Sequence, residues 1–212
     1  MSDAPRILIF GGTFDPPHRA HRILPPMVAE KLSCDEILYI PAAINPLKLD
    51  APPTPSEHRL AMLKLAVAPV PKARITTMEL EREGPSYTVD TLRELKETGG
   101  RETELRLLIG ADQAASFHRW REWKTIVELA RPAVMLRAPW DDAKSLEAQW
   151  REHHDAERVA WWRSCIVPLP NVPVSSTDVR ERIRQREPLT DLLDPPVIEY
   201  IFRHGLYGAN AG

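Results

Sequence analysis

The chain has 212 residues, which is enough to bury a sizeable core and lies near the upper end of single-domain length. Its 28 basic and 30 acidic residues give a net charge of −2, which excludes a general binder of nucleic acid or of membrane surfaces, because both need a clear positive excess. Cys34 and Cys165 lie far apart, so neither a disulfide framework nor a CxxC metal site is indicated. No apolar run is long enough for a signal peptide or a membrane span, so a cytoplasmic protein is expected.

Apolar runs of strand length recur along the chain, and most look buried on both faces, as in a parallel sheet. They occupy residues 6–10, 36–41, 73–80, 104–110, 133–138 and 165–169. Segments of helical period lie between and after them, at 18–32, 54–67, 88–100 and 194–204. This alternation predicts an α/β fold, a doubly wound, mostly parallel sheet with helices on both faces, in a single domain that spans 1–212.

Two of these helices carry clear start signals. Thr54 is expected as an N-cap, with Pro55 at the first helical position and Glu57 completing a capping box. Thr88 is expected to cap the next helix, which Gly99 then ends.

The region 139–164 is charged and long for a connection between strands. We expect a helical insertion there, which the sequence leaves open as a lid, an interface or a satellite core. It carries Trp140, Trp150, Trp161 and Trp162. His153 and His154 beside Asp155 are expected to be solvated rather than metal-binding.

The stretch GGTFDPPHRAH, at 11–21, follows the first strand. It lacks the third glycine of the dinucleotide fingerprint and the GK[ST] of the phosphate-cradling loop. We interpret it as a glycine turn that leads into a helix after two prolines, whose free N–H groups and dipole favour an anion. His18 and His21, three residues apart, share one helical face and can both donate to phosphate oxygens. The alternative is a tight turn followed by two surface histidines.

A second helix start, PVSSTDVRERI at 173–183, has Ser175 or Ser176 as its cap. It also offers the Thr177 hydroxyl and, one turn in, Arg180. Taken alone, such a cap is more often structural. In doubly wound folds ligands bind beyond the carboxyl ends of the strands, which places GGTFDPPH, NPLK and GAD on one rim.

The first stretch resembles the GTFDPxHxGH signature of the HxGH nucleotidyltransferases, and the second resembles their ISSTxIR motif. IPAAINPLK, SEHRLAML, SYTVDTL, LIGADQAASFHRW and PLTDLLDPPVIEYIFRHGLYG extend the likeness to bacterial nicotinate mononucleotide adenylyltransferases, from residue 6 to about 208, apart from the insertion. The resemblance implies a Rossmann-like fold and adenylyl transfer from ATP to nicotinate mononucleotide with Mg²⁺. The products are nicotinate adenine dinucleotide and pyrophosphate, in a step of NAD biosynthesis.

Carried over by motif, the resemblance implies site residues at the following positions. ATP binding falls to Gly11, Gly12, Thr13, Phe14, His18, His21, Gly110, Asp112, Ser176, Thr177 and Arg180. Nicotinate mononucleotide binding falls to Lys48, Thr88, Trp120 and Arg121, and the catalytic residues are His18, His21, Lys48 and Arg180. The resemblance implies that Gly110 and Asp112 lie by the adenosine ribose or the metal, and it names no residue as a metal ligand.

Plainer roles stay open for several of these residues. Thr88 can be only a helix cap, Trp120 only core, Lys48 only a solvated loop residue, and Asp112 the cap of the helix that follows it. Ala20 departs from the signature, which has glycine there, and it adds a methyl group where backbone can approach the phosphates.

The acceptor phosphate is already ionised near neutral pH, because its second pKa is about 6, so no protein base is needed. The task is to offset repulsion between two polyanions, and we expect the two histidines, Lys48 and Arg180 to supply positive potential for direct in-line attack. The expected partners are ATP and the mononucleotide, with no nucleic acid or membrane. The alternatives are an enzyme with a nicotinamide mononucleotide or phosphopantetheine acceptor, or a non-catalytic nucleotide-sensing module.

Overall fold

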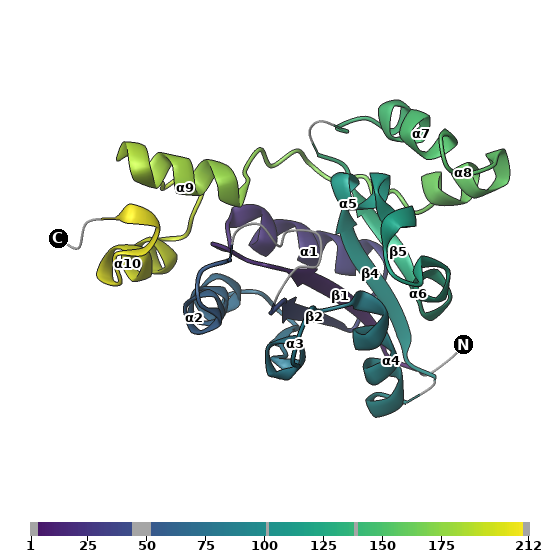
Figure 1. The fold of residues 1–212 in the computed structure, drawn as a ribbon, viewed down its shortest axis with the longest axis horizontal. Helices are drawn as coiled ribbons and strands as arrows, with labels where there is room; N and C mark the ends of the chain where they lie inside the picture. Colours follow the sequence, from purple (N-terminus) through teal and green to yellow (C-terminus); the bar gives the residue numbers. More distant parts are fainter. Residues whose placement is uncertain (1–3, 44–51, 101, 138–139, 210–212) are drawn as a thin grey trace.

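The computed structural model describes residues 4–43, 52–100, 102–137 and 140–209 (Figure 1). Its centre is a five-stranded sheet in the order β3-β2-β1-β4-β5, with every neighbouring pair parallel. The strands are β1 (Arg6–Gly12), β2 (Glu36–Pro41), β3 (Ala73–Ile75), β4 (Glu104–Gly110) and β5 (Ala130–Met135). The chain runs outward from β1 to β3 and then restarts on the other side at β4. Ligands of such sheets bind at this reversal, beyond the carboxyl ends of β1 and β4.

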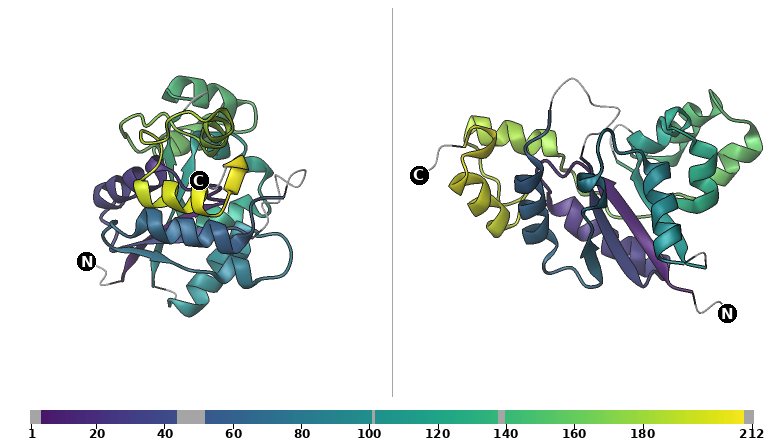
Figure 2. Two further views of the ribbon diagram at one scale, coloured as in Figure 1. Left: turned by 90° about the vertical axis from the view of Figure 1, so that its left-hand side faces the viewer. Right: turned by 60° about the horizontal axis from the view of Figure 1, so that its bottom comes forward.

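Helices cover both faces of the sheet, as the sequence predicts (Figure 2). Side chains of α1 and α2 pack on one face, and those of α4, α5 and α6 pack on the other. The helices are α1 (Arg19–Lys31), α2 (Ser56–Val67), α3 (Met78–Glu81), α4 (Thr88–Thr98), α5 (Ala111–Ala115), η1 (Phe117–Arg119), α6 (Trp123–Leu129), α7 (Ala143–Arg151), α8 (Ala156–Arg163), α9 (Ser176–Gln185), α10 (Pro195–Arg203) and η2 (Leu206–Gly208).

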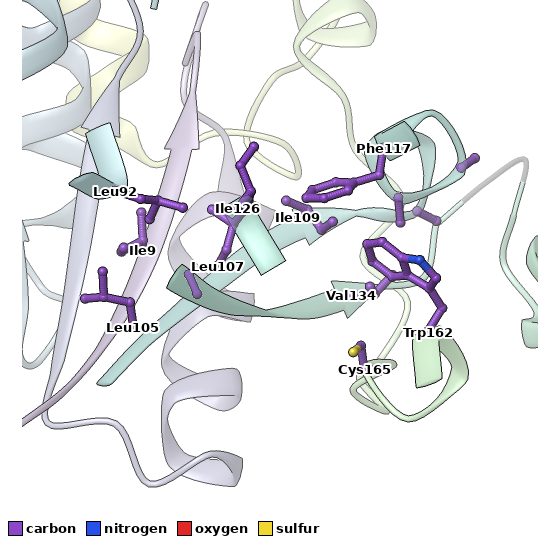
Figure 3. Close-up of a cluster of buried hydrophobic side chains, with 14 of the residues drawn as sticks. Ile9, Leu92, Leu105, Leu107, Ile109, Phe117, Ile126, Val134, Trp162 and Cys165 are labelled. Carbon is purple, nitrogen blue, oxygen red and sulfur yellow. The ribbon is translucent and has the colours of Figure 1, made fainter. Parts of the chain in front are cut away.

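The largest of the three core clusters that the described residues form lies between the sheet and α4 to α6 (Figure 3). Ile9 of β1 and Leu107 of β4 are 2% and 3% exposed and lie under Leu92 of α4 and Ile126 of α6. Fully burying a side chain of this size contributes roughly 1.5–3 kcal/mol. The rigid sheet therefore fixes the rim from which the loops of the site begin.

The region 139–164, where we expect a helical insertion, holds the helices α7 and α8. It belongs to the main core: Trp150 and Trp162 are 1% and 0% exposed, and their stacked rings lie 5.5 Å apart. The Trp150 indole also donates a hydrogen bond of 3.0 Å to the carbonyl of Ala114 in α5. His153 is exposed and its ring lies 3.7 Å from that of His118, and the described residues hold no group of three metal-binding side chains.

Two strand predictions are wrong. The run 165–169 forms only one isolated bridge, between Val134 and Ile166, because Pro168 has no backbone N–H with which to continue the strand. The run 73–80 is a strand only up to Ile75; four residues later Glu79 belongs to a short helix and is buried, where its carboxylate accepts a 2.6 Å hydrogen bond from Thr91. The strand expected at 133–138 begins earlier, at Ala130, and ends at Met135.

The predicted helix starts are partly wrong as well. Pro55, not Thr54, is the N-cap of α2, and no capping box forms. The reason is tertiary: the Thr54 N–H donates to the Asp15 carboxylate at 3.2 Å, and its carbonyl accepts from Arg59 at 2.8 Å. Thr88 is the first residue of α4, whose N-cap is Tyr87. The expected end at Gly99 and the last helix, from the Asp194 cap to His204, are confirmed.

A third apolar cluster joins α2, α9 and α10 at the edge of the molecule opposite the insertion (Figure 1). In the described part of the chain, no helix is both long and apolar enough to cross a bilayer. Cys34 and Cys165 are free and buried.

Candidate active site

The loop after β1 turns at Phe14 rather than at the glycines, which corrects the predicted glycine turn. Gly11 and Gly12 are the last two residues of the strand, and neither has a positive φ, whereas Phe14 has φ 51° and the Asp15–Pro16 peptide bond is cis. A Cβ on Gly12 would lie 3.2 Å from the Phe14 ring. The glycine is needed for space, because the Phe14 ring, 2% exposed, folds back into the core.

His18 and His21 are held together at the start of α1. His18 is the N-cap, and its backbone N–H donates to Nδ1 of His21 at 3.1 Å. The two rings stack with centroids 3.7 Å apart, and the His21 ring packs 5.0 Å from that of Phe14. His18 is only 4% exposed, so the alternative of two surface histidines is wrong. Because Nδ1 of His21 accepts, the neutral ring carries its proton on Nε2, which is then a donor.

Both histidines are uncharged at neutral pH. Burial lowers the pKa of His18 to about 4, and the nearby Arg137 guanidinium adds to the effect. Burial also lowers the pKa of His21 well below its ordinary value, with further contributions from His18 and Arg137. In the free protein these rings therefore offer N–H donors rather than the positive charge that we expected from the sequence.

The second motif contacts the first directly, although some 160 residues separate them in the chain. Ser175 is the N-cap of α9, and the Ser176 hydroxyl donates to the carbonyl of Pro16 at 2.9 Å. The Arg180 guanidinium donates to the carbonyl of Asp15 at 2.6 Å. The N-terminal ends of α1 and α9 are thus brought together on one rim, as the sequence predicts.

The end of β4 contributes a third element. Gly110 caps α5, and Asp112 in its first turn forms an ion pair with Arg137 at 2.7 Å. A Cβ on Gly110 would lie 2.6 Å from the Asp112 carboxylate and 3.0 Å from Nε of Arg137, so any other residue would displace the pair from this position. Sequence reasoning missed Arg137. Its signal was its position two residues beyond β5, on the same rim.

The residues expected to bind the mononucleotide come from α4 and from the segment after η1. The Arg121 guanidinium lies 4.7 Å from the centre of the Tyr87 ring, directly before Thr88, and 3.9 Å from Asp90. Trp120 stacks on the buried Phe117 at 4.8 Å. These segments are therefore adjacent. Lys48, the remaining residue expected here, lies outside the described residues.

Arg59 is a second residue that sequence reasoning missed. Its side chain is 1% exposed, and Nη1 donates to the carbonyls of Thr13 and Ala42 at 2.8 and 2.9 Å. The only feature of the sequence that could have indicated its burial was its place in a helix among apolar residues such as Met62 and Leu63, which are buried in the structure.

The parallel sheet, its reversal between β1 and β4, and the two joined helix starts define a nucleotide-binding class of α/β protein. The family model described as cytidylyltransferase-like matches residues 9–182, which include both motifs. The chain therefore belongs to the cytidylyltransferase-like family.

Curated relatives narrow the family further. A nicotinate-nucleotide adenylyltransferase of Chromobacterium violaceum is 36% identical over 208 residues, covering 95% of this chain and 98% of the relative. One of Roseiflexus sp. is 39% identical over 208 residues, covering 98% and 100%. Within the larger family, the chain thus belongs with the nicotinate-nucleotide adenylyltransferases.

Solved structures agree on the fold. A Plasmodium falciparum nicotinic acid mononucleotide adenylyltransferase complexed with NaAD superimposes with a TM-score of 0.75 at 20% identity, covering 98% of this chain and 100% of that one. The same enzyme complexed with APC gives a TM-score of 0.74 at 19% identity and the same coverage.

Proposed function

We propose that this protein transfers the adenylyl group of ATP to nicotinate mononucleotide, forming nicotinate adenine dinucleotide and releasing pyrophosphate. The observation that carries the proposal is the contact of residues 15–18 with residues 176–180, through the 2.9 Å and 2.6 Å hydrogen bonds of Ser176 and Arg180. Two helix N-termini that face one rim offer backbone N–H groups and dipoles to a polyphosphate. The relatives named above support the choice of substrates.

On the ATP side, the neutral His18 and His21 rings donate N–H groups to phosphate oxygens. Ser176, Thr177 and Arg180 hold the outer phosphates, which leave as pyrophosphate. Arg180 donates from one nitrogen to the Asp15 carbonyl and from a second to the Thr177 hydroxyl at 3.4 Å, and its remaining N–H groups are available to the ligand. Thr13 and the glycine-ended β1 let the backbone approach the nucleotide, and Gly110 with Asp112 face the adenosine.

On the acceptor side, Trp120 stacks on the pyridine ring, while the start of α4 at Thr88 and the backbone near Arg121 receive its carboxylate. Lys48 completes the site between the substrates. The acceptor phosphate is the nucleophile and is mostly ionised at neutral pH, so the protein aligns it and needs no base. The transfer is direct, without an adenylylated enzyme.

Magnesium fits this site as a companion of ATP. Among the described residues no three metal-binding side chains cluster, and Asp112 offers one carboxylate on the rim, already paired with Arg137. Mg²⁺ is commonly bound by one or two carboxylates together with substrate phosphates and water, which matches this donor set. When bound, it neutralises charge on the phosphate oxygens. We further propose that the chain forms a single domain that includes α7 and α8. We also propose that the enzyme is cytoplasmic.

The test is pyrophosphate release by the purified full chain with ATP and Mg²⁺, offered nicotinate mononucleotide, nicotinamide mononucleotide or phosphopantetheine in parallel. We expect turnover with the first and at most slow turnover with the others. Preference for another acceptor would reassign the substrate. Binding of ATP without turnover of any acceptor would make the protein a nucleotide-sensing module.

A further inference from the structure

Arg59 in α2 is a buried cation whose hydrogen bonds all go to backbone carbonyls. Within the described part of the chain no carboxylate lies within ion-pair distance of it. Nε donates to Thr54 at 2.8 Å, and the two terminal nitrogens donate to Thr13, Ala42 and Ala43, at 2.8, 2.9 and 3.5 Å. Burial lowers its pKa, and the Asp15 charge opposes that effect.

The carbonyls that Arg59 binds belong to both substrate sides of the rim. Thr13 follows β1 in the loop proposed for ATP, whereas Ala42 and Ala43 follow β2. The N–H of Ala43 donates in turn to the Ser86 hydroxyl at 3.2 Å. Ser86 lies two residues before Thr88 on the proposed acceptor side, so a continuous set of hydrogen bonds joins the two sides.

The Ser86 side chain is itself held in place, by the buried carboxylate of Glu79. It is 8% exposed and hydrogen-bonds to the carboxylate of Glu79, which is also buried and accepts from Thr91 at 2.6 Å. Arg59 therefore binds the carbonyls of Ala42 and Ala43. The Ser86 hydroxyl, held by Glu79, accepts from the N–H of Ala43.

A role in packing alone does not account for this arrangement. Replacing buried ions by apolar side chains of similar volume is often neutral or stabilising, because desolvating a charge is costly. Only the guanidinium fork can reach several carbonyls from different segments at once; a lysine acts at a single point.

We propose that Arg59 is a positioning residue, which sets the loop after β1 against the segment after β2 so that the ATP phosphates and the acceptor phosphate meet in line. The proposal rests on the proposed adenylyl transfer. Because a displacement of about 1 Å can cost about 100-fold in rate, the effect falls on turnover more than on the binding of either substrate alone.

The test compares Arg59→Lys with Met62→Ala as a matched control, since Met62 is a fully buried residue of the same helix that packs in the apolar cluster of α2, α9 and α10. We measure kcat, the Kd of ATP and of nicotinate mononucleotide separately, and the melting temperature. For Arg59→Lys we expect kcat to fall about 10- to 100-fold, with each Kd within about threefold of wild type. For Met62→Ala we expect a lower melting temperature and unchanged kcat below it.

Ser86→Ala tests the other half of the connection and keeps the test decisive if Arg59→Lys does not fold. It removes one hydroxyl, and we expect a smaller fall in kcat, about fivefold to tenfold, with both Kd values retained. The positioning role would be overturned if kcat equals that of wild type in Ser86→Ala and, provided that it folds, in Arg59→Lys. So would an effect confined to the melting temperature. Absence of turnover in wild type would instead overturn the proposed function.

Discussion

The α9 and α10 end of the molecule lies opposite the α7 and α8 end (Figures 1 and 2). At the first end, α9 and η2 reach the loop after β1 through polar groups, whereas at the second end α7 and α8 pack against α5 and η1 through buried indole rings. At the first end, hydroxyl and guanidinium groups bind the backbone of Asp15 and Pro16. At the second end, Trp150 and Trp162 extend the core beside α5. We therefore expect the insertion to contribute mainly stability, while the α9 end shapes the loop that we propose binds ATP.

The largest expected effect is on stability at the insertion end. Trp150→Ala removes a fully buried indole and its hydrogen bond to Ala114, so we expect a loss of about 3–5 kcal/mol in unfolding free energy and a melting temperature lower by roughly 10 °C. Denaturant and thermal unfolding measure it. Turnover per folded molecule should stay within about threefold of wild type. Trp150→Phe, which keeps most of the packing, should lose much less stability; a large loss of turnover in either variant would reject the division of roles.

The next effect is on turnover at the other end. His21→Ala removes the ring that we propose donates to the phosphates, and we expect kcat to fall about 100-fold to 1000-fold while the fold persists. Pyrophosphate release and circular dichroism measure the two quantities. His153→Ala, on the exposed connection between α7 and α8, is the control and should leave kcat unchanged. Undiminished turnover in His21→Ala would remove this residue from the mechanism.

A third prediction concerns the stability that His18, a residue of the candidate site, contributes at different pH. His18 has an ordinary pKa of 6.5, lowered to about 4 in the folded state, so between those values the unfolded chain binds a proton that the folded chain does not. Stability is therefore lost as pH falls below about 6.5, and His18 contributes a loss of about 2 kcal/mol between pH 7 and pH 5.

Denaturation midpoints at pH 7 and pH 5 check this value, with His18→Gln as the comparison, because glutamine does not titrate. We expect the variant to lose less stability than wild type on acidification. Equal losses in the two proteins would mean that the His18 ring is not buried in its neutral form.

The smallest effect concerns the acceptor. Trp120→Ala should raise the KM for nicotinate mononucleotide about tenfold, since stacking of an aromatic base on an indole contributes about 1–3 kcal/mol. The KM for ATP should change much less, and Trp120→Phe should recover most of the loss. Parallel rises in both KM values would instead assign Trp120 to the core, beside Phe117.

Local pattern was enough for much of the fold. The strands at 36–41 and 104–110 match the predicted ranges, because each is a mostly apolar run that the sheet buries. The run at 165–169 is also mostly apolar but forms a single bridge at Ile166, since Pro168 has no backbone N–H to donate. Apolar character alone does not separate these two cases.

Site residues that belong to a sequence motif could be predicted, whereas those defined by tertiary contacts could not. The joined helix starts at His18 and Ser176 were expected from their motifs. Arg59 and Arg137 were not, because their partners, the Thr13 carbonyl and the Asp112 carboxylate, come from distant segments. The uncharged state of the histidines was missed for the same reason, since burial is a property of the assembled fold.

The hydroxyl of Tyr207, in η2, donates to the Asp15 carboxylate at 2.6 Å. Asp15 is the same residue whose carbonyl accepts from Arg180. A change at Tyr207 would thus act on the loop after β1 itself, through a single phenol hydroxyl.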